Sequence, residues 1–246
     1  GIYGTGINFG LSAAISDLNK DGLPDIFVTN DYSEQDFCYI NKGDGTFKEV
    51  SKSSFGHFSK YAMGSDIADL NNDLEPDLFV VDMLPEDNYR QKALKGADNY
   101  NRAQTLIDSG YHHQYMRNNL QINRGHDPVG NLQFSEIAQL SGISNTDWSW
   151  APLIADYDND GLKDIFVTNG YLRDYSNLDF NNYTVNEAVQ SAQEKGVPLD
   201  VGLLISKIPA TKISNYAFKN KDGLAFENTT LDWGLTIKTV SNAAAY

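Results

Sequence analysis

Cysteine is almost absent from this chain, because Cys38 is the only one among 246 residues. A single cysteine excludes an intrachain disulfide framework and any cysteine-rich zinc site. Cys38 lies in the stretch "DFCYI". Because unpaired cysteine usually behaves as a small apolar residue, we expect it to be half-buried and to have no chemical role.

The chain also lacks long apolar runs and an excess of positive charge. No apolar stretch approaches the roughly 20 residues that span a bilayer, and the opening "GIYGTGINFG" has no signal-peptide pattern, so we expect no transmembrane segment. The 19 Lys and Arg residues stand against 33 Asp and Glu, a formal net charge of -14. This balance argues against nucleic acid and against anionic membranes. Cations and neutral polymers are better-suited partners.

Acidic residues, by contrast, are concentrated in three similar stretches. They are "SDLNKDGLPDIFVTN" at 16–30, "ADLNNDLEPDLFVVD" at 68–82 and "ADYDNDGLKDIFVTN" at 155–169. Each reads D-x-[ND]-x-D-x-x-x-D and runs into a β-rich segment. Like charges this close repel one another, and Asp is rare in strands, so the pattern predicts a bound cation.

The acidic stretches belong to a longer repeat. A strand of small residues precedes each, and a hairpin follows at "FCYINKGDGTFKEVS", "NLQINRGHDPVGNLQFSEIA" and "YAFKNKDGLAFENTT". Four antiparallel strands per repeat predict an all-β fold, a partial β-propeller. We place its blades at 9–50, 59–140 and 147–232, with a further blade starting at 239–246. Because propellers close with about four to eight blades, residues 1–246 are interpreted as one fragment of a longer propeller.

Two insertions lengthen the second and third repeats, at 84–118 and 171–214. Both are predicted to be partly helical, at "YRQKALKG", "NRAQTLIDSG" and "TVNEAVQSAQEKG". In the last of these, Thr184 and Glu187 fit a capping box that begins a helix, and Gly196 fits its end.

Calcium is the cation that the acidic loops suit best. It takes about six to eight oxygen ligands, and each loop offers side chains at positions 1, 3, 5 and 9 and a carbonyl at position 7. An EF-hand is excluded because its position 12 requires Glu, whereas Val stands there in all three loops. We therefore predict about three calcium sites. Their ligands are Asp17, Asn19, Asp21, the Leu23 carbonyl and Asp25; Asp69, Asn71, Asp73, the Glu75 carbonyl and Asp77; and Asp156, Asp158, Asp160, the Leu162 carbonyl and Asp164.

The three loops are not equivalent. Gly22 and Gly161 follow position 5 in the first and third loops, but Leu74 replaces glycine in the second. If the backbone there is left-handed, Leu costs roughly 1 to 2 kcal/mol, so the loop at Asp69 fits calcium least well. The third loop has four carboxylates and the first has three. We expect affinity to fall from the third loop to the first and then to the second.

These motifs resemble the FG-GAP or VCBS repeat propellers of integrin α-subunits, cartilage acidic protein and large bacterial surface proteins. The pattern D-x-[ND]-x-D-G-x-x-D-[IL]-x-V carries the resemblance, and "WSWAPL" and "FGLSAA" are loose forms of the Phe-Gly/Gly-Ala-Pro signature. The resemblance implies calcium in the loops and a binding or adhesion role. It also implies an extracellular or cell-surface location, outer-membrane-associated and as a lipoprotein if the protein is bacterial, within a larger surface complex.

Two function classes remain open. The first is a calcium-stabilised scaffold whose inserted loops bind a protein or glycan partner. Strand parity places both insertions on the face opposite the acidic loops, and they contain seven of the 14 tyrosines. The second is a propeller enzyme, a lyase or hydrolase acting on polysaccharide. We find no catalytic motif and expect no enzyme activity. A glycan-cleavage assay would separate the two classes.

Overall fold

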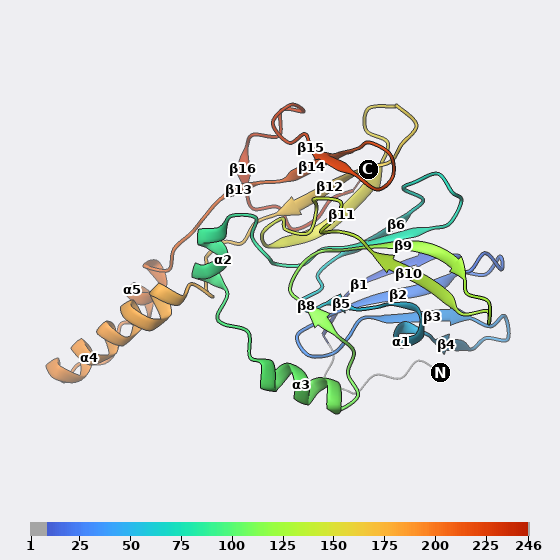
Figure 1. Ribbon diagram of the computed structural model, residues 1–246. Helices are drawn as coiled ribbons and strands as arrows, with labels where there is room; N and C mark the ends of the chain where they lie inside the picture. Colours follow the sequence, from blue (N-terminus) through green and yellow to red (C-terminus); the bar gives the residue numbers. More distant parts are fainter. Residues whose placement is uncertain (1–8, 246) are drawn as a thin grey trace.

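The computed structural model describes residues 9–245 and is mostly β. Three four-stranded antiparallel sheets follow one another along the chain (Figure 1), and the strands of each sheet lie side by side in chain order. The first sheet contains β1 (Phe9–Ser16), β2 (Asp25–Asp31), β3 (Phe37–Asn41) and β4 (Phe47–Glu49). The second contains β6 (Ser65–Ala68), β7 (Asp77–Val80), β9 (Asn119–His126) and β10 (Leu132–Glu136). The third contains β11 (Ser149–Ala155), β12 (Asp164–Asn169), β14 (Tyr216–Asn220) and β15 (Phe226–Asn228).

Two apolar cores join the sheets, and the alternation of side chains along β7 supplies both. Leu78 packs in the core shared with Phe27 of the first sheet. Phe79, the next residue, packs in the core shared with Ile165 of the third sheet. Successive side chains of a strand point to opposite faces, so the middle sheet is apolar on both. Cys38 belongs to the first core and is fully buried, not half-buried.

Both insertions are partly helical, as predicted, and leave the sheets between the second and third strands. The first contains α2 (Asn88–Leu94) and α3 (Tyr100–Asp108), and the second contains α4 (Val185–Lys195) and α5 (Val201–Ser206). Figure 1 shows these helices on one side of the sheets, with α4 and α5 projecting away as an arm. A short helix, α1 (Ser51–Ser54), follows β4. Among residues 9–245, no helix is both long enough and apolar enough to cross a membrane.

The predicted capping box at Thr184 is wrong, although the predicted helix end is confirmed. Thr184 is itself helical, with φ -64°, because a π-helical turn, η1 (Phe180–Thr184), runs directly into α4. The side chain of Asn177 accepts the Phe180 N–H at 2.8 Å and so begins this longer helix. Gly196 ends α4 with φ 62°. The short helix α5 has no counterpart among the predicted elements.

Two small sheets fasten the insertions to the body. β5 (Phe58–Ser59) pairs in parallel with β8 (Gln114–Tyr115), and β13 (Ile213–Ser214) pairs with β16 (Lys238–Thr239). After β16, the Ser241 N–H donates to the Asn169 carbonyl at 2.9 Å. An equivalent hydrogen bond occurs one sheet earlier, where the N–H of Ser149, at the start of β11, donates to the Asp82 carbonyl at 3.3 Å. Residue 246, the last of the predicted further blade, lies outside the described residues.

A buried ion network holds α2 against the second insertion. The guanidinium of Arg90 donates from Nε to Asp147 at 2.7 Å and lies 3.5 Å from Asp174. Thr211 donates a further hydrogen bond of 2.7 Å to Asp174. Both carboxylates are 4% exposed, so they need this compensation for their burial.

Candidate metal centre

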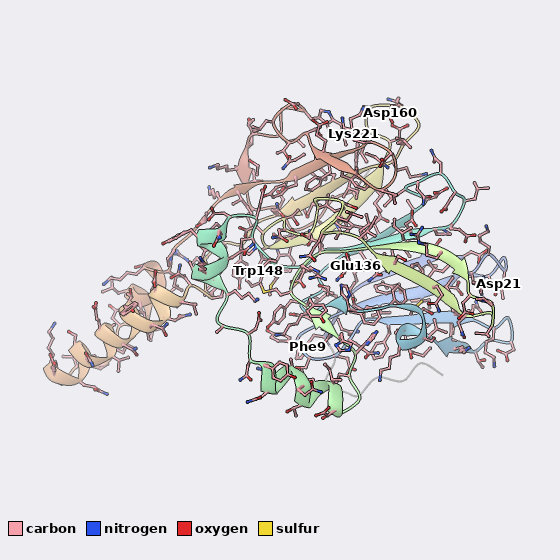
Figure 2. The ribbon with its side chains drawn as sticks, viewed as in Figure 1. Phe9, Asp21, Glu136, Trp148, Asp160 and Lys221 are labelled. Carbon is pink, nitrogen blue, oxygen red and sulfur yellow. The ribbon has the colours of Figure 1, made fainter. Side chains whose placement is uncertain are left out.

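The three acidic loops connect the first and second strands of their sheets, and they lie on the side away from the helices. Figure 2 shows Asp21 and Asp160, from the first and third loops, at this edge of the molecule. The loops have the same backbone turn, with positive φ at positions 4 and 6. The angles are 60° and 85° at Lys20 and Gly22, 58° and 69° at Asn72 and Leu74, and 60° and 91° at Asn159 and Gly161. Leu74 therefore adopts the left-handed conformation that glycine adopts in the other two loops.

The aspartate at position 1 organises each turn. In the first loop Asp17 accepts the N–H of Asp21 at 3.0 Å and of Gly22 at 2.8 Å. Asp69 and Asp156 accept the equivalent pairs of N–H groups at 2.9 to 3.1 Å. These bonds close the loop around its carboxylates.

The aspartate at position 9 is fully buried at the start of the second strand. Asp25, Asp77 and Asp164 are each 0% exposed. Burial raises the pKa of all three, and backbone hydrogen bonds offset this only in part. For Asp77 the pKa is raised to about 7. A nearby cation would favour the ionised form of such a buried carboxyl.

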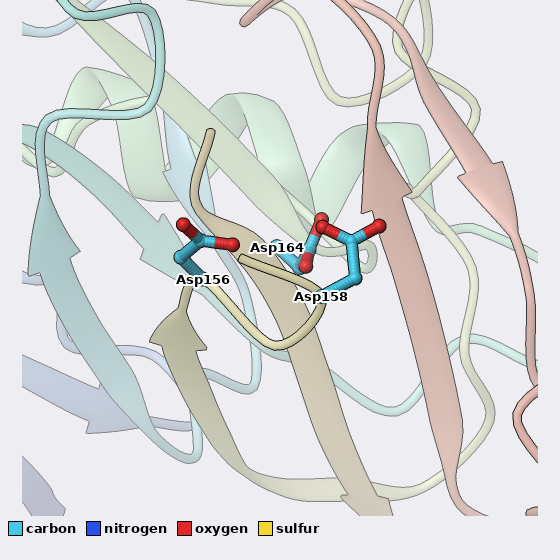
Figure 3. A group of neighbouring side chains, drawn as sticks. All are labelled: Asp156, Asp158 and Asp164. Atoms are coloured by element: carbon cyan, nitrogen blue, oxygen red, sulfur yellow. The ribbon is translucent and has the colours of Figure 1, made fainter. Parts of the chain in front are cut away.

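The third loop brings three of its predicted ligands together. Oxygen atoms of Asp156, Asp158 and Asp164 all lie within 4.8 Å of one another (Figure 3). Among residues 9–245, these three form the one cluster of potential metal ligands. Three carboxylates around one point are a donor set that suits a hard cation. This cluster could hold a metal ion.

In the first and second loops an amide takes part in place of the second carboxylate. Asn19 donates from Nδ2 to Asp21 at 2.9 Å, and Asn71 donates to Asp73 at the same distance. Each amide oxygen accepts the N–H of that same aspartate. The side chain of Glu75 points away from its own loop, to Lys20 of the first loop at 2.7 Å.

A lysine of β14, which sequence reasoning missed, extends its side chain to the carboxylates of the third loop. The ammonium of Lys219, in β14, pairs with Asp158 and lies 2.9 Å from Asp160. Hydrogen bonds to these two carboxylates raise the pKa of Lys219. The equivalent residues of the other sheets are Ile40 and Ile122, so this cation belongs to the third sheet alone. Asp158 belongs to the carboxylate cluster, whereas Asp160, paired with the same ammonium, lies outside it.

Each loop is also tied to the third strand of its sheet by an asparagine. Asn41, Asn123 and Asn220 donate their backbone N–H to Asp25, Asp77 and Asp164 at 2.8 to 2.9 Å. The signal for these residues was present in the sequence, because "YIN", "QIN" and "FKN" place an Asn at the same position of all three repeats.

The repeat visible in these loops is also detected by comparison with protein families. The FG-GAP-like repeat matches residues 17–80, which run from the first acidic loop to the end of β7. A search of the curated proteins gave no match. The matched segment includes two of the three acidic loops and the aspartates at their first and last positions. Residues 17–80 of this chain are therefore an FG-GAP-like repeat.

Proposed function

We propose that this chain is part of a β-propeller at the cell surface, a calcium-stabilised scaffold that binds a protein or glycan through its helical insertions. The observation that carries the proposal is the division of the molecule into two faces. The acidic loops lie at one edge of the sheets, and both insertions leave from the other (Figures 1 and 2). One face thus suits a structural ion, and the other offers long segments on a rigid support.

The repeat and the packing of the sheets both support the propeller. FG-GAP repeats imply propeller blades, and each four-stranded sheet here packs on the next through an apolar core. Sheets that pack face to face in chain order, each with its acidic loop at the same edge, are what a propeller requires.

Calcium is the ion we assign to the loops. Their oxygen donors suit a hard cation, and extracellular calcium modules have dissociation constants of about 0.1 to 1 mM. With a constant of about 0.1 mM in 1 mM calcium, each site contributes roughly 1.4 kcal/mol to the free energy of unfolding. Thermal unfolding in calcium and in excess EGTA tests this assignment. We expect a clear loss of melting temperature on chelation, and coincident melting curves would refute it.

The partner-binding face is proposed from exposed tyrosines and from charge. Tyr is favoured at interfaces because it combines a large apolar ring with a polar tip. The insertions differ from the acidic scaffold, with net charges of +1 for 84–118 (five Lys and Arg, four Asp and Glu) and -1 for 171–214 (four and five). Five of the seven tyrosines in the insertions are exposed, by 47% to 76% of their surface: Tyr89, Tyr100, Tyr115, Tyr175 and Tyr183.

The ion pairs of Arg90 with Asp147 and Asp174 hold α2 in place, so this face is preorganised for binding. A surface ordered in advance binds with a smaller entropic loss.

A triple variant, Tyr89→Ser, Tyr100→Ser and Tyr183→Ser, tests the face against arrays of glycans and of extracellular proteins. We expect it to lose the ligands that the unchanged chain retains, with unaltered calcium-dependent melting. Val129→Ser is the matched control, because Val129 is 81% exposed but lies in the β9–β10 hairpin, in the scaffold. Equal binding by the triple variant and the control would show that these tyrosines of the insertions do not take part in ligand recognition. Incubation of bound glycans with the chain in calcium checks the further expectation that they are not cleaved.

A further inference from the structure

In each of the three sheets, the residue just before the third strand makes the same kind of hydrogen bond. Its side-chain oxygen accepts the N–H of a residue at the end of the second strand or just after it. Asn118 accepts from Asp82 at 2.8 Å and Asn215 accepts from Asn169 at 2.9 Å. In the first sheet the acceptor is Asp36, which accepts from Asn30 at 2.8 Å. An aspartate therefore takes the place of the asparagine in the other two sheets.

Asparagine and ionised aspartate differ in that only asparagine has a side-chain hydrogen-bond donor. An asparagine side chain has an NH2 group, and Asn118 uses it to reach the Ile143 carbonyl at 2.9 Å and Thr146 at 2.6 Å. An ionised aspartate has none. At Asp36 the second oxygen, Oδ2, has no hydrogen-bond partner among the described residues, and neither has Oδ1 of Asn30. Both residues are 0% exposed.

Two buried acceptors without a donor among the described residues are unfavourable, and an ionised Asp36 would add a buried charge that accepts a single hydrogen bond. A carboxylic acid offers an O–H group at the position where asparagine offers N–H. The Asn30 amide nitrogen is already occupied, because it donates to the Gln35 carbonyl at 2.9 Å. Its oxygen, Oδ1, has no donor among the described residues.

A second buried carboxyl nearby decides which of the two holds the charge. Asp82 is 0% exposed, and its charge acts on Asp36. Asp82 accepts hydrogen bonds from the hydroxyl of Ser59 and from four backbone N–H groups, those of Lys60, Tyr61, Met83 and Arg117. Burial raises the pKa of Asp82 too, but these donors offset the effect in part, whereas Asp36 accepts only one hydrogen bond, from Asn30.

We propose that Asp36 is a neutral carboxylic acid at neutral pH, a stand-in for asparagine, and that its ionisation loosens the junction between the first sheet and the first insertion. The junction is built from its neighbours: the Gln35 side chain accepts the His112 N–H at 2.9 Å, and the Glu34 carbonyl accepts from Gln114 at 2.9 Å. A negative charge on Asp36 would be buried away from water and would repel the charge of Asp82 nearby.

The surrounding charges are compatible with this assignment. Asp31 ends β2, Glu34 lies on the same connection as Asp36, Asp82 follows β7, and His112 comes from the first insertion. Burial raises the pKa of Asp36 well above its usual range; the Asn30 N–H offsets this only in part, and Asp82 raises it further. The folded state then holds a proton that the unfolded state releases above pH about 4. Stability is therefore present at low pH and is lost as pH rises towards the pKa in the folded chain.

The test compares the full chain with Asp36→Asn and with the reverse exchange, Asn118→Asp, by thermal unfolding at pH 4 to 9 and fixed free calcium. In the interval where only the folded state is protonated, the folding equilibrium of the unchanged chain should lose about tenfold per pH unit relative to Asp36→Asn. Asn118→Asp should show a new loss of the same sign. Parallel curves for Asp36→Asn and the unchanged chain would overturn the proposal, whether or not Asn118→Asp folds.

Two further readouts separate the proton from general stability. A difference infrared spectrum at pH 7 should contain a protonated-carboxyl band that Asp36→Asn removes; its absence would overturn the proposal. Hydrogen exchange at the His112 amide should accelerate with pH beyond the intrinsic rate in the unchanged chain but not in Asp36→Asn. Equal acceleration in both would show that Asp36 does not control the junction.

Discussion

The side-chain amide of Asn123 donates a hydrogen bond of 2.9 Å to the carbonyl of Leu18, in the acidic loop of the preceding sheet. Asn220 repeats the contact one sheet later, to the Leu70 carbonyl at 2.7 Å. Each of these asparagines also donates its backbone N–H to the buried aspartate of its own loop. The geometry of a candidate metal loop is thus coupled to the packing between neighbouring sheets.

Asn220→Ala should therefore weaken both the fold and the third loop. Asn220 is 0% exposed, and its loss leaves the Leu70 and Lys163 carbonyls without this donor. A buried polar group without its partner costs about 1 to 3 kcal/mol. The matched control is Asn41→Ala, because the amide of Asn41 reaches only as far as Pro24 of its own sheet, at 3.1 Å. Denaturant unfolding in calcium measures both. A loss as large for Asn41→Ala as for Asn220→Ala would contradict a role between sheets.

Leu74→Gly should stabilise the chain. Leu74 is 77% exposed and has φ 69°, so it adopts a left-handed conformation with little burial in return. Relief of that conformation, less the entropy that glycine loses on folding, should add about 0.5 to 1 kcal/mol. Leu140→Gly is the control, since Leu140 is 82% exposed and is not among the described residues with positive φ. Chemical denaturation should show a gain for the first variant and none for the second.

How much of this could be predicted from the sequence depends on how local each feature is. The acidic loops, their strands and the position of the insertions follow from a pattern repeated within about 15 residues, which the backbone must satisfy three times. Lys219 and the inter-sheet contact of Asn220 join residues 61 and 150 positions apart. No local pattern specifies such pairs. The capping box at Thr184 was wrong because the preceding π-helical turn, itself begun at Asn177, had already started the helix.

Lys219 bears on the expected order of affinity in the loops. The sequence ranks the third loop first because it has four carboxylates, but the ammonium of Lys219 pairs with Asp158 and Asp160 and would compete with a metal ion there. Lys219→Met should raise the calcium affinity of the third loop several-fold in a calorimetric titration. Lys221→Met is the control, because Lys221 pairs with Glu227 instead. An unchanged or weaker affinity in Lys219→Met would show that the lysine does not compete.

Arg90→Met should detach the first insertion from the second while leaving the sheets folded. The variant leaves Asp147 and Asp174 buried without their shared cation, and removing one partner of a buried ion network costs about 3 to 5 kcal/mol. Because α2 has no buried residue of its own, this loss should appear as local opening. Hydrogen exchange resolved along the chain should therefore accelerate in α2 and not in the strands of the second sheet.

Arg102→Met serves as its control, since Arg102 lies in α3 of the same insertion and is exposed. That variant should leave exchange in α2 unchanged. A partial rescue is expected when Arg90→Met is combined with Asp147→Asn, because the amide removes one of the two unpaired charges. If the double variant were no more protected than Arg90→Met alone, the unpaired charge of Asp147 would not be the cause of the opening.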